Sequence, residues 1–188
     1  MLKRTLSKDS LLTLLRVLDL EVLHEIGPME IVDMVIVGGA AFMCDGLTER
    51  ELTQDIDVIE ASEPVAKCIP QIPEINTSCA VFLDCLPYGY EDRLVEIPIS
   101  LTSIRVFRPS LEDLVVMKLR SYRDHDIEDI TSPEVLRRID WEQLQHLIYD
   151  PDEAKASCMA DIDYKMLVAK YEDYRRQWGP EQGGKAKE

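Results

Sequence analysis

The feature that most restricts the fold of this chain is an apolar run that ends in two glycines. Residues 34–37 are all apolar, and Gly38 and Gly39 follow directly. A continuous apolar run of this length predicts a β-strand that is buried on both faces. Residues 40–43 then predict a short helix that ends at Gly46. The chain is therefore expected to contain a sheet with helices packed against it.

Other segments extend this pattern to an α+β fold. Apolar or alternating segments predict strands at residues 56–59, 81–86, 94–97 and 104–107. Helical spacing and capping signals predict helices at residues 10–26, 110–130, 134–138, 141–149 and 161–178. Residues 62–80 contain three prolines and predict a loop with little regular structure. We expect a core at residues 1–130, a C-terminal helical extension at 131–178 and a disordered tail at 179–188.

The charge balance excludes several functions. Lys and Arg number 21 and Asp and Glu number 36, so the formal net charge is −15. A chain this acidic repels polyphosphates unless it supplies a local basic strip or divalent cations, so we expect no binding to duplex DNA. No apolar run approaches the ~20 residues that cross a bilayer, and Arg16, Asp19 and Glu21 interrupt the first apolar segment. We therefore expect a cytoplasmic protein without a membrane partner.

Two aspartates alternate with apolar residues at the second predicted strand. Asp55 and Asp57 are two residues apart, so their carboxylates point to the same side, roughly 6–7 Å apart at the backbone. Two like charges this close are unfavourable unless a cation lies between them. Mg²⁺ is commonly held by one or two carboxylates together with substrate phosphates. The alternative is a pair of solvated acids, which is what we expect of Asp161 and Asp163.

The glycine pair offers a place for phosphate. Because Gly38 and Gly39 lack a Cβ, their backbone N–H groups can approach a ligand closely. The short helix that starts there adds its positive N-terminal end. Alone this is a weak signal, because Gly-Gly turns are common.

Lys118 lies in the middle of the apolar stripe of the helix predicted at residues 110–130. On a continuous helix, Asp126 and Asp129 fall within about 80° of it on the same side. A lysine that points inward is costly unless it is paired or placed at a site. Two interpretations remain open: Lys118 belongs to a site, or its ammonium either reaches solvent or pairs locally with Asp126 or Asp129.

Together these residues resemble the signature of the nucleotidyltransferase superfamily with the polymerase-β-like fold. The matching pieces are the glycine pair, a short helix, and Thr53-x-Asp55-x-Asp57 on the next strand, with Arg50 upstream. The resemblance implies a nucleotidyltransferase-like core in which Gly38, Gly39 and Thr53 lie near the phosphates of a nucleoside triphosphate. It also implies that Asp55 and Asp57 bind catalytic Mg²⁺ or Mn²⁺.

A second segment, residues 109–130, resembles a characteristic block of the AbiEii-type nucleotidyltransferase-like toxins and their small relatives. There the resemblance implies that Lys118 faces nucleotide phosphates and that Asp126 or Asp129 belongs to the active site. The superfamily usually has a third carboxylate on a later strand. Asp84 is the first candidate for this metal ligand and Glu96 the second, although neither lies in a recognisable motif.

Four further residues are open to two interpretations. Arg105 and Arg108 either contact phosphate or offset the acidic surface, and we favour the second. Trp141 and Trp178 stand at helical positions, where we expect packing residues rather than platforms for base stacking.

Two functional hypotheses follow. The first is a metal-dependent nucleotidyltransferase that moves a nucleoside monophosphate to a hydroxyl on an RNA end, such as that of a tRNA, or on a protein side chain. The resemblance to toxins adds an antitoxin as a partner. The second is a catalytically inactive nucleotide-binding or protein-interaction module with the same fold, which the lack of a motif for a third carboxylate favours.

Overall fold

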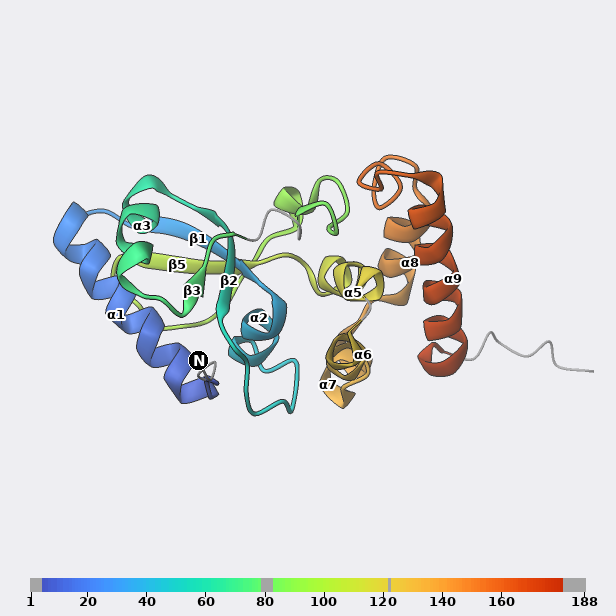
Figure 1. Cartoon of the computed structure of the whole chain (residues 1–188), viewed down its shortest axis with the longest axis horizontal. Coiled ribbons are helices and arrows are strands. Elements are labelled where there is room, and N and C mark those ends of the chain that lie inside the picture. The colour runs from blue at the N-terminus through green and yellow to red at the C-terminus, as the bar shows by residue number, and fades with distance from the viewer. Residues whose placement is uncertain (1–4, 79–82, 122, 181–188) are drawn as a thin grey trace, which may run out of the picture.

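The computed structural model describes residues 5–78, 83–121 and 123–180 of the chain (Figure 1). It is an α+β fold in which a sheet and its helices occupy one end and a group of helices occupies the other. The strands are β1 (Val32–Val37), β2 (Ile56–Ala61), β3 (Ile75–Asn76), β4 (Val95–Glu96) and β5 (Ile104–Arg108). The helices beside the sheet are α1 (Lys8–Ile26), α2 (Gly38–Cys44) and α3 (Glu63–Cys68). The other helices are α5 (Leu111–Arg120), α6 (Asp124–Ile130), α7 (Pro133–Arg138), α8 (Trp141–Tyr149) and α9 (Asp161–Trp178).

Within the described residues the sheet is mixed, with strand order β3-β2-β1-β5-β4. β1 pairs antiparallel with β2 and parallel with β5, β2 pairs parallel with β3, and β4 pairs antiparallel with β5. The register sets Val37 opposite Asp57, and Asp57 opposite Asn76. The start of α2, Asp57 and Asn76 therefore lie side by side at one end of the sheet.

The core of the sheet half is built on β1 and β2. Residues 34–37 of β1 are all buried, so this strand is covered on both faces, as predicted. β2 alternates: Ile56 and Val58 are buried, which leaves Asp57 on the opposite face. The apolar stripe of α1 is also buried, and α1 packs against α2 and α3. These contacts fix the sheet end that carries the two aspartates.

In the helical half, α5 packs against α8 and α9, and nearly all of its residues are buried (Figure 1). Its N-terminus is capped by Ser110, whose side chain accepts a hydrogen bond from the Asp113 backbone N–H. No described helix combines the length and the apolar character needed to cross a membrane. The division of the chain at residue 130 stays a prediction.

Three predictions about elements were wrong. Residues 62–80 are not all loop: they contain α3, a 3₁₀ turn at Ile69–Gln71 (η1) and β3, because Pro64 lies in the first turn of α3, where no intrahelical N–H is needed. The helix predicted at 110–130 ends at Arg120, and α6 begins at Asp124.

The third error concerns the strand predicted at 81–86. Residues 81 and 82 lie outside the described residues, residue 83 is helical, and residues 84–86 form a turn and a bend, so no strand is found among residues 83–86. The tail predicted to be disordered lies outside the described residues from 181 onward. The other strands and helices were predicted to within a few residues of their ends.

Candidate functional site

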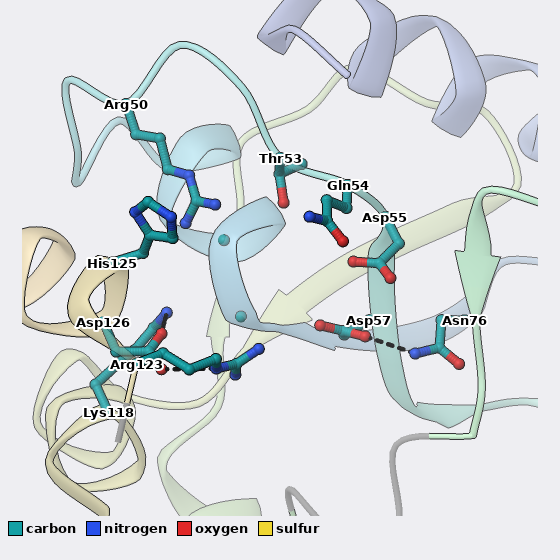
Figure 2. A pocket seen from close by; sticks show the side chains of 12 residues that line it. Arg50, Thr53, Gln54, Asp55, Asp57, Asn76, Lys118, Arg123, His125 and Asp126 are labelled. Atoms are coloured by element: carbon teal, nitrogen blue, oxygen red, sulfur yellow. Dashed lines mark hydrogen bonds and ion pairs between the residues drawn. The ribbon is translucent and has the colours of Figure 1, made fainter. Parts of the chain in front are cut away.

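A cavity of about 280 Å³ lies where the end of the sheet meets α2, α5 and α6 (Figure 2). Asp55, Asp57 and Asn76 form one side of it, which we call the acidic wall. Asp55 directly precedes β2, and both aspartates are half-buried. The Asn76 Nδ2 group donates a hydrogen bond of 2.9 Å to Asp57 Oδ1. The parallel pairing of β3 with β2 therefore fixes the orientation of the Asp57 carboxylate.

The two glycines make room for these side chains. A Cβ at Gly38 would lie 2.8 Å from Asp57 Oδ2, and Gly38 has a φ of +67° that disfavours other residues. A Cβ at Gly39 would lie 2.9 Å from Thr53 Oγ1 and 3.3 Å from Arg50 Nη1. A side chain at either position would therefore displace Asp57 or Thr53, a reason for the two glycines that the sequence did not reveal.

The opposite side of the cavity, which we call the basic wall, gathers basic side chains from three segments. Lys118 comes from α5, Arg123 and His125 from the start of α6, and Arg50 from the segment before β2. Figure 2 shows these residues across the cavity from Asp55 and Asp57. In a chain with a net charge of −15, this local basic strip is the feature that an anionic ligand needs.

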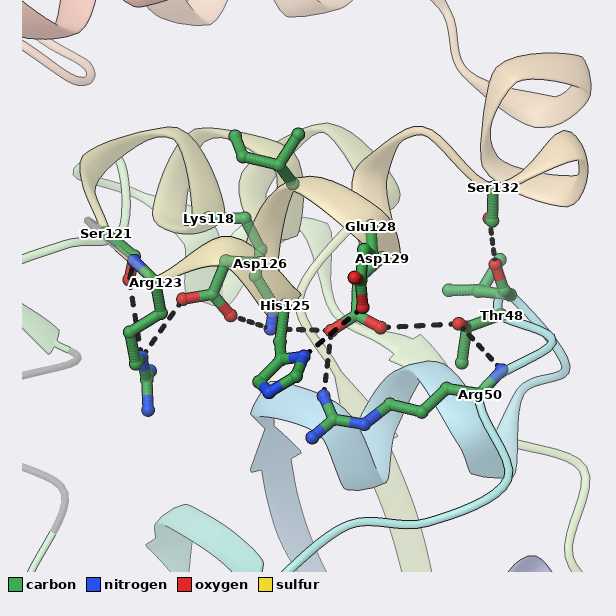
Figure 3. Close-up of polar contacts among 12 residues, drawn as sticks. Thr48, Arg50, Lys118, Ser121, Arg123, His125, Asp126, Glu128, Asp129 and Ser132 are labelled. Atoms are coloured by element: carbon green, nitrogen blue, oxygen red, sulfur yellow. Dashed lines mark hydrogen bonds and ion pairs between the residues drawn. The ribbon is translucent and has the colours of Figure 1, made fainter.

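Two buried aspartates hold the basic wall in place (Figure 3). Lys118 is only 3% exposed, and its ammonium donates to Asp126 Oδ1 and, at 2.9 Å, to Asp129 Oδ2. Asp129 Oδ2 also accepts from Arg50 Nη1 at 3.3 Å, and Asp129 Oδ1 accepts from Thr48 Oγ1 at 3.3 Å. Lys118 therefore lines the cavity and is paired with both aspartates rather than with solvent, and its role in a functional site stays a prediction.

Asp126 also positions Arg123, whose Nε donates to Asp126 Oδ2 at 3.1 Å. Burial alone would raise the pKa of the Asp126 carboxyl. The charge of Lys118, hydrogen bonds from Lys118 and Ser121, and the charge of Arg123 outweigh burial and lower this pKa. Asp126 is therefore ionised at neutral pH and holds two cations at the cavity.

The carboxylates on the acidic wall suit a hard divalent cation with few protein ligands. Among the described residues, no group of three or more His, Cys, Asp or Glu side chains is arranged to hold a metal ion. Asp55 and Asp57 alone match the way Mg²⁺ binds, through one or two carboxylates with the remaining positions filled by water and substrate oxygens. The donor set fits Mg²⁺ or Mn²⁺ and does not suit zinc, which prefers nitrogen and sulfur ligands.

Several predicted residues lie elsewhere. Asp84 is exposed on the turn after residue 82 and does not line the cavity, and Glu96 is exposed on β4. Arg105 pairs with Asp33, with a shortest distance of 2.8 Å. Arg108 is buried and pairs with Asp45 at 2.7 Å, so both arginines are engaged in ion pairs away from the cavity.

The two tryptophans differ from each other. Trp141 is half-buried and packs against Tyr174, with ring centroids 5.3 Å apart, as expected of a packing residue. Trp178 is 47% exposed at the end of α9.

The sequence analysis missed Gln54, Asn76, Arg123 and His125 as lining residues. Asn76 lies in a segment predicted to be a loop, so its register against Asp57 had no signal. Arg123 and His125 lie where the helix predicted at residues 110–130 is interrupted, and neither proline nor glycine marks this break in the sequence.

One family model matches residues 13–179, and it is described as a nucleotidyltransferase of unknown function (DUF6036). The matched region contains both walls of the cavity and extends through α9. Comparisons with curated proteins and with solved structures gave no match.

Proposed function

The chain belongs to this family of nucleotidyltransferases, and from that premise we propose that it is a Mg²⁺- or Mn²⁺-dependent nucleotidyltransferase with a polymerase-β-like core. Its reaction moves a nucleoside monophosphate from a nucleoside triphosphate to a hydroxyl group on an acceptor. The sheet, the glycine pair at the start of α2 and the two aspartates at the start of β2 support this fold assignment.

The proposal rests mainly on the acidic wall and the basic wall, which face each other across the cavity. Asp55 and Asp57 suit a divalent cation, and Lys118, Arg50 and Arg123 face them across the cavity. A metal–triphosphate complex has a cation and an anionic chain side by side, so it complements both walls at once. Neither wall alone distinguishes a nucleotide from another ligand.

In the proposed reaction the acceptor oxygen bonds to the α-phosphorus, the bond between the α- and β-phosphates breaks, and pyrophosphate and a proton are released. Asn76 holds the Asp57 carboxylate in one orientation, and Asp126 and Asp129 hold the Lys118 ammonium beside the leaving phosphates. When bound at Asp55 and Asp57, the cation supplies Lewis-acid stabilisation of charge on the phosphates. Positioning and charge stabilisation supply most of the catalysis.

The proposal also includes the class of acceptor. The resemblance of residues 109–130 to AbiEii-type toxins supports an RNA end, such as that of a tRNA, or a protein side chain as the acceptor, with an antitoxin as partner. The net charge of −15 restricts contact with RNA to the local basic wall.

A specific observation favours the second candidate, an inactive nucleotide-binding or protein-interaction module. Asp84, the first candidate for a third carboxylate, is exposed and lies outside the cavity. Binding must therefore be measured separately from transfer.

The test uses nucleoside triphosphates labelled at the α-phosphate, with Mg²⁺ and with RNA or protein extracts as acceptors. Asp57→Asn should lower incorporation of label by about 100-fold or more, because it removes a charge from the acidic wall. Asp92→Asn, at an exposed position of the 3₁₀ helix Tyr90–Arg93 (η2), is the matched control and should transfer like the wild type.

Retained transfer in Asp57→Asn, with its fold verified by circular dichroism, would remove Asp57 from the mechanism. Nucleotide binding by the wild type without transfer from any of the four nucleotides would support the module instead.

A further inference from the structure

A second cavity, of about 300 Å³, lies between α6 and α9. We call it the α6–α9 cavity. It adjoins the candidate site, because Arg123 lines both cavities. Arg123 is the N-cap residue of α6 and its side chain is held by Asp126, so it has a defined place at the border between them.

The lining of the α6–α9 cavity differs in chemistry from the candidate site. Its apolar surface comes from Leu119, Ile127, Tyr174 and the ring of Trp178. Ile127 and Trp178 are each 47% exposed, so this surface is open to a ligand. Polar groups stand around it, among them those of Thr131 and Gln177. An apolar surface with polar groups at its edge suits a planar heteroaromatic ring.

The two sides of the cavity are joined by hydrogen bonds from α9. Lys170 Nζ donates to the Ser121 backbone oxygen at 2.7 Å, and the Tyr174 hydroxyl donates to the Ile130 backbone oxygen at 2.6 Å. These contacts tie α9 to the end of α5 and to the end of α6. The cavity is therefore preformed and does not depend on closure of α9.

The candidate site lacks an apolar surface like that of the α6–α9 cavity. Among the described residues that line the candidate site, the side chains are polar or charged, and the imidazole of His125 is the one ring. Such a lining suits phosphates and a cation but gives no apolar face to a base. A nucleotide that places its phosphates there needs a separate surface for its base.

We propose that the α6–α9 cavity binds the nucleobase of the donor nucleoside triphosphate, with Trp178 as the stacking surface. The proposal rests on the proposed function, since it needs the triphosphate in the candidate site. It also revises the expectation that Trp178 is a packing residue. Arg123, between the two cavities, then contacts the part of the nucleotide that joins base and phosphates.

The test compares ligands with and without a base. Isothermal titration calorimetry on the purified full chain with Mg²⁺ measures binding of inorganic tripolyphosphate and of α,β-methylene analogues of the four nucleoside triphosphates. Trp178→Ala should weaken binding of the preferred analogue by about tenfold and leave tripolyphosphate binding unchanged, because one stacked base contributes an effect of this size. Trp178→Phe keeps an aromatic face and should retain most of the affinity. Tyr88→Ala, at a residue that is 72% exposed and lies outside both cavities, is the matched control.

The outcomes separate this inference from the proposed function. Unchanged binding of the analogues to Trp178→Ala would overturn the inference, as would equal loss of tripolyphosphate binding, which indicates a displaced α9. Wild-type protein that binds the analogues no more tightly than tripolyphosphate would overturn it too. Wild-type protein that binds neither ligand would overturn the proposed function itself, and the inference with it.

Discussion

Gly38 has a positive φ and also lies close to Asp57, and comparison with Gly46 separates the effects of these two constraints. Gly38 and Gly46 both have a φ of +67°. A Cβ at Gly38 would lie 2.8 Å from Asp57 Oδ2, whereas the nearest atom to a Cβ at Gly46 is Lys8 Nζ at 4.0 Å. Substitution by alanine therefore adds backbone strain at both positions but a steric clash only at Gly38.

Gly46→Ala should lower the free energy of unfolding by about 1–2 kcal/mol, the cost of a left-handed backbone conformation for alanine. Gly38→Ala should cost about 1–3 kcal/mol more, because Asp57 must move. Urea unfolding followed by circular dichroism measures both values. Combining Gly38→Ala with Asp57→Ala should recover this extra cost, since the Asp57 Cβ is 3.8 Å away. Equal losses for the two single variants would show that Asp57 does not constrain Gly38.

At the scale of single residues, the sequence predicted the two aspartates of the acidic wall but not its asparagine. The spacing of Asp55 and Asp57 and the glycine pair are local patterns, and local geometry determines them. The hydrogen bond from Asn76 to Asp57 depends on β3, a two-residue strand whose register comes from tertiary pairing. No propensity in residues 62–80 indicates that pairing, so Asn76 could not be predicted.

At the scale of elements, the break between α5 and α6 shows a limit of helical periodicity. Residues 121–123 contain neither proline nor glycine, so the sequence gives no signal that the helix ends at Arg120. Lys118 nonetheless contacts Asp126 and Asp129, as the continuous helix predicted, although the three residues belong to two separate helices. These buried ion pairs are tertiary contacts, which local propensity does not describe.

The lowered pKa of Asp126 makes the contact between α5 and α6 dependent on pH. A carboxyl whose pKa is lower in the folded than in the unfolded state stabilises the fold above its unfolded pKa. The stability is lost as the pH falls through the folded pKa. Asp126→Asn should cost about 1–3 kcal/mol at pH 7, because it removes a charged partner of Lys118. The difference between wild type and variant should shrink between about pH 5 and pH 2.

Thermal unfolding across this pH range measures the effect. Asp92→Asn, with its exposed side chain, is the control and should keep the pH dependence of the wild type. A constant difference between Asp126→Asn and the wild type at all pH values would show that ionisation of Asp126 does not stabilise the contact.

At the scale of the whole molecule, side-chain contacts as well as the chain itself join the sheet half to the helical half. α5 follows β5 directly and packs against α8 and α9. Arg93 of η2 pairs with Asp113 of α5 at 2.8 Å and with Glu153, after α8, at 2.9 Å. The candidate site itself takes Asp57 from the sheet half and Lys118 from α5. These shared residues argue that the sheet half and the helical half depend on each other.

This arrangement predicts a single cooperative unfolding transition for the full chain. Trp141 and Trp178 both lie in the helical half, so their fluorescence reports on that half, whereas far-ultraviolet circular dichroism reports on every helix and strand. Urea midpoints from the two probes should coincide. Arg93→Met should lower the free energy of unfolding by about 1–3 kcal/mol, because the buried Asp113 then loses a partner. Both urea midpoints should therefore fall together. A fluorescence transition at lower urea than the circular dichroism transition would show that the helical half unfolds independently. The candidate site would then lose Lys118 while the sheet half, with Asp55 and Asp57, stayed folded.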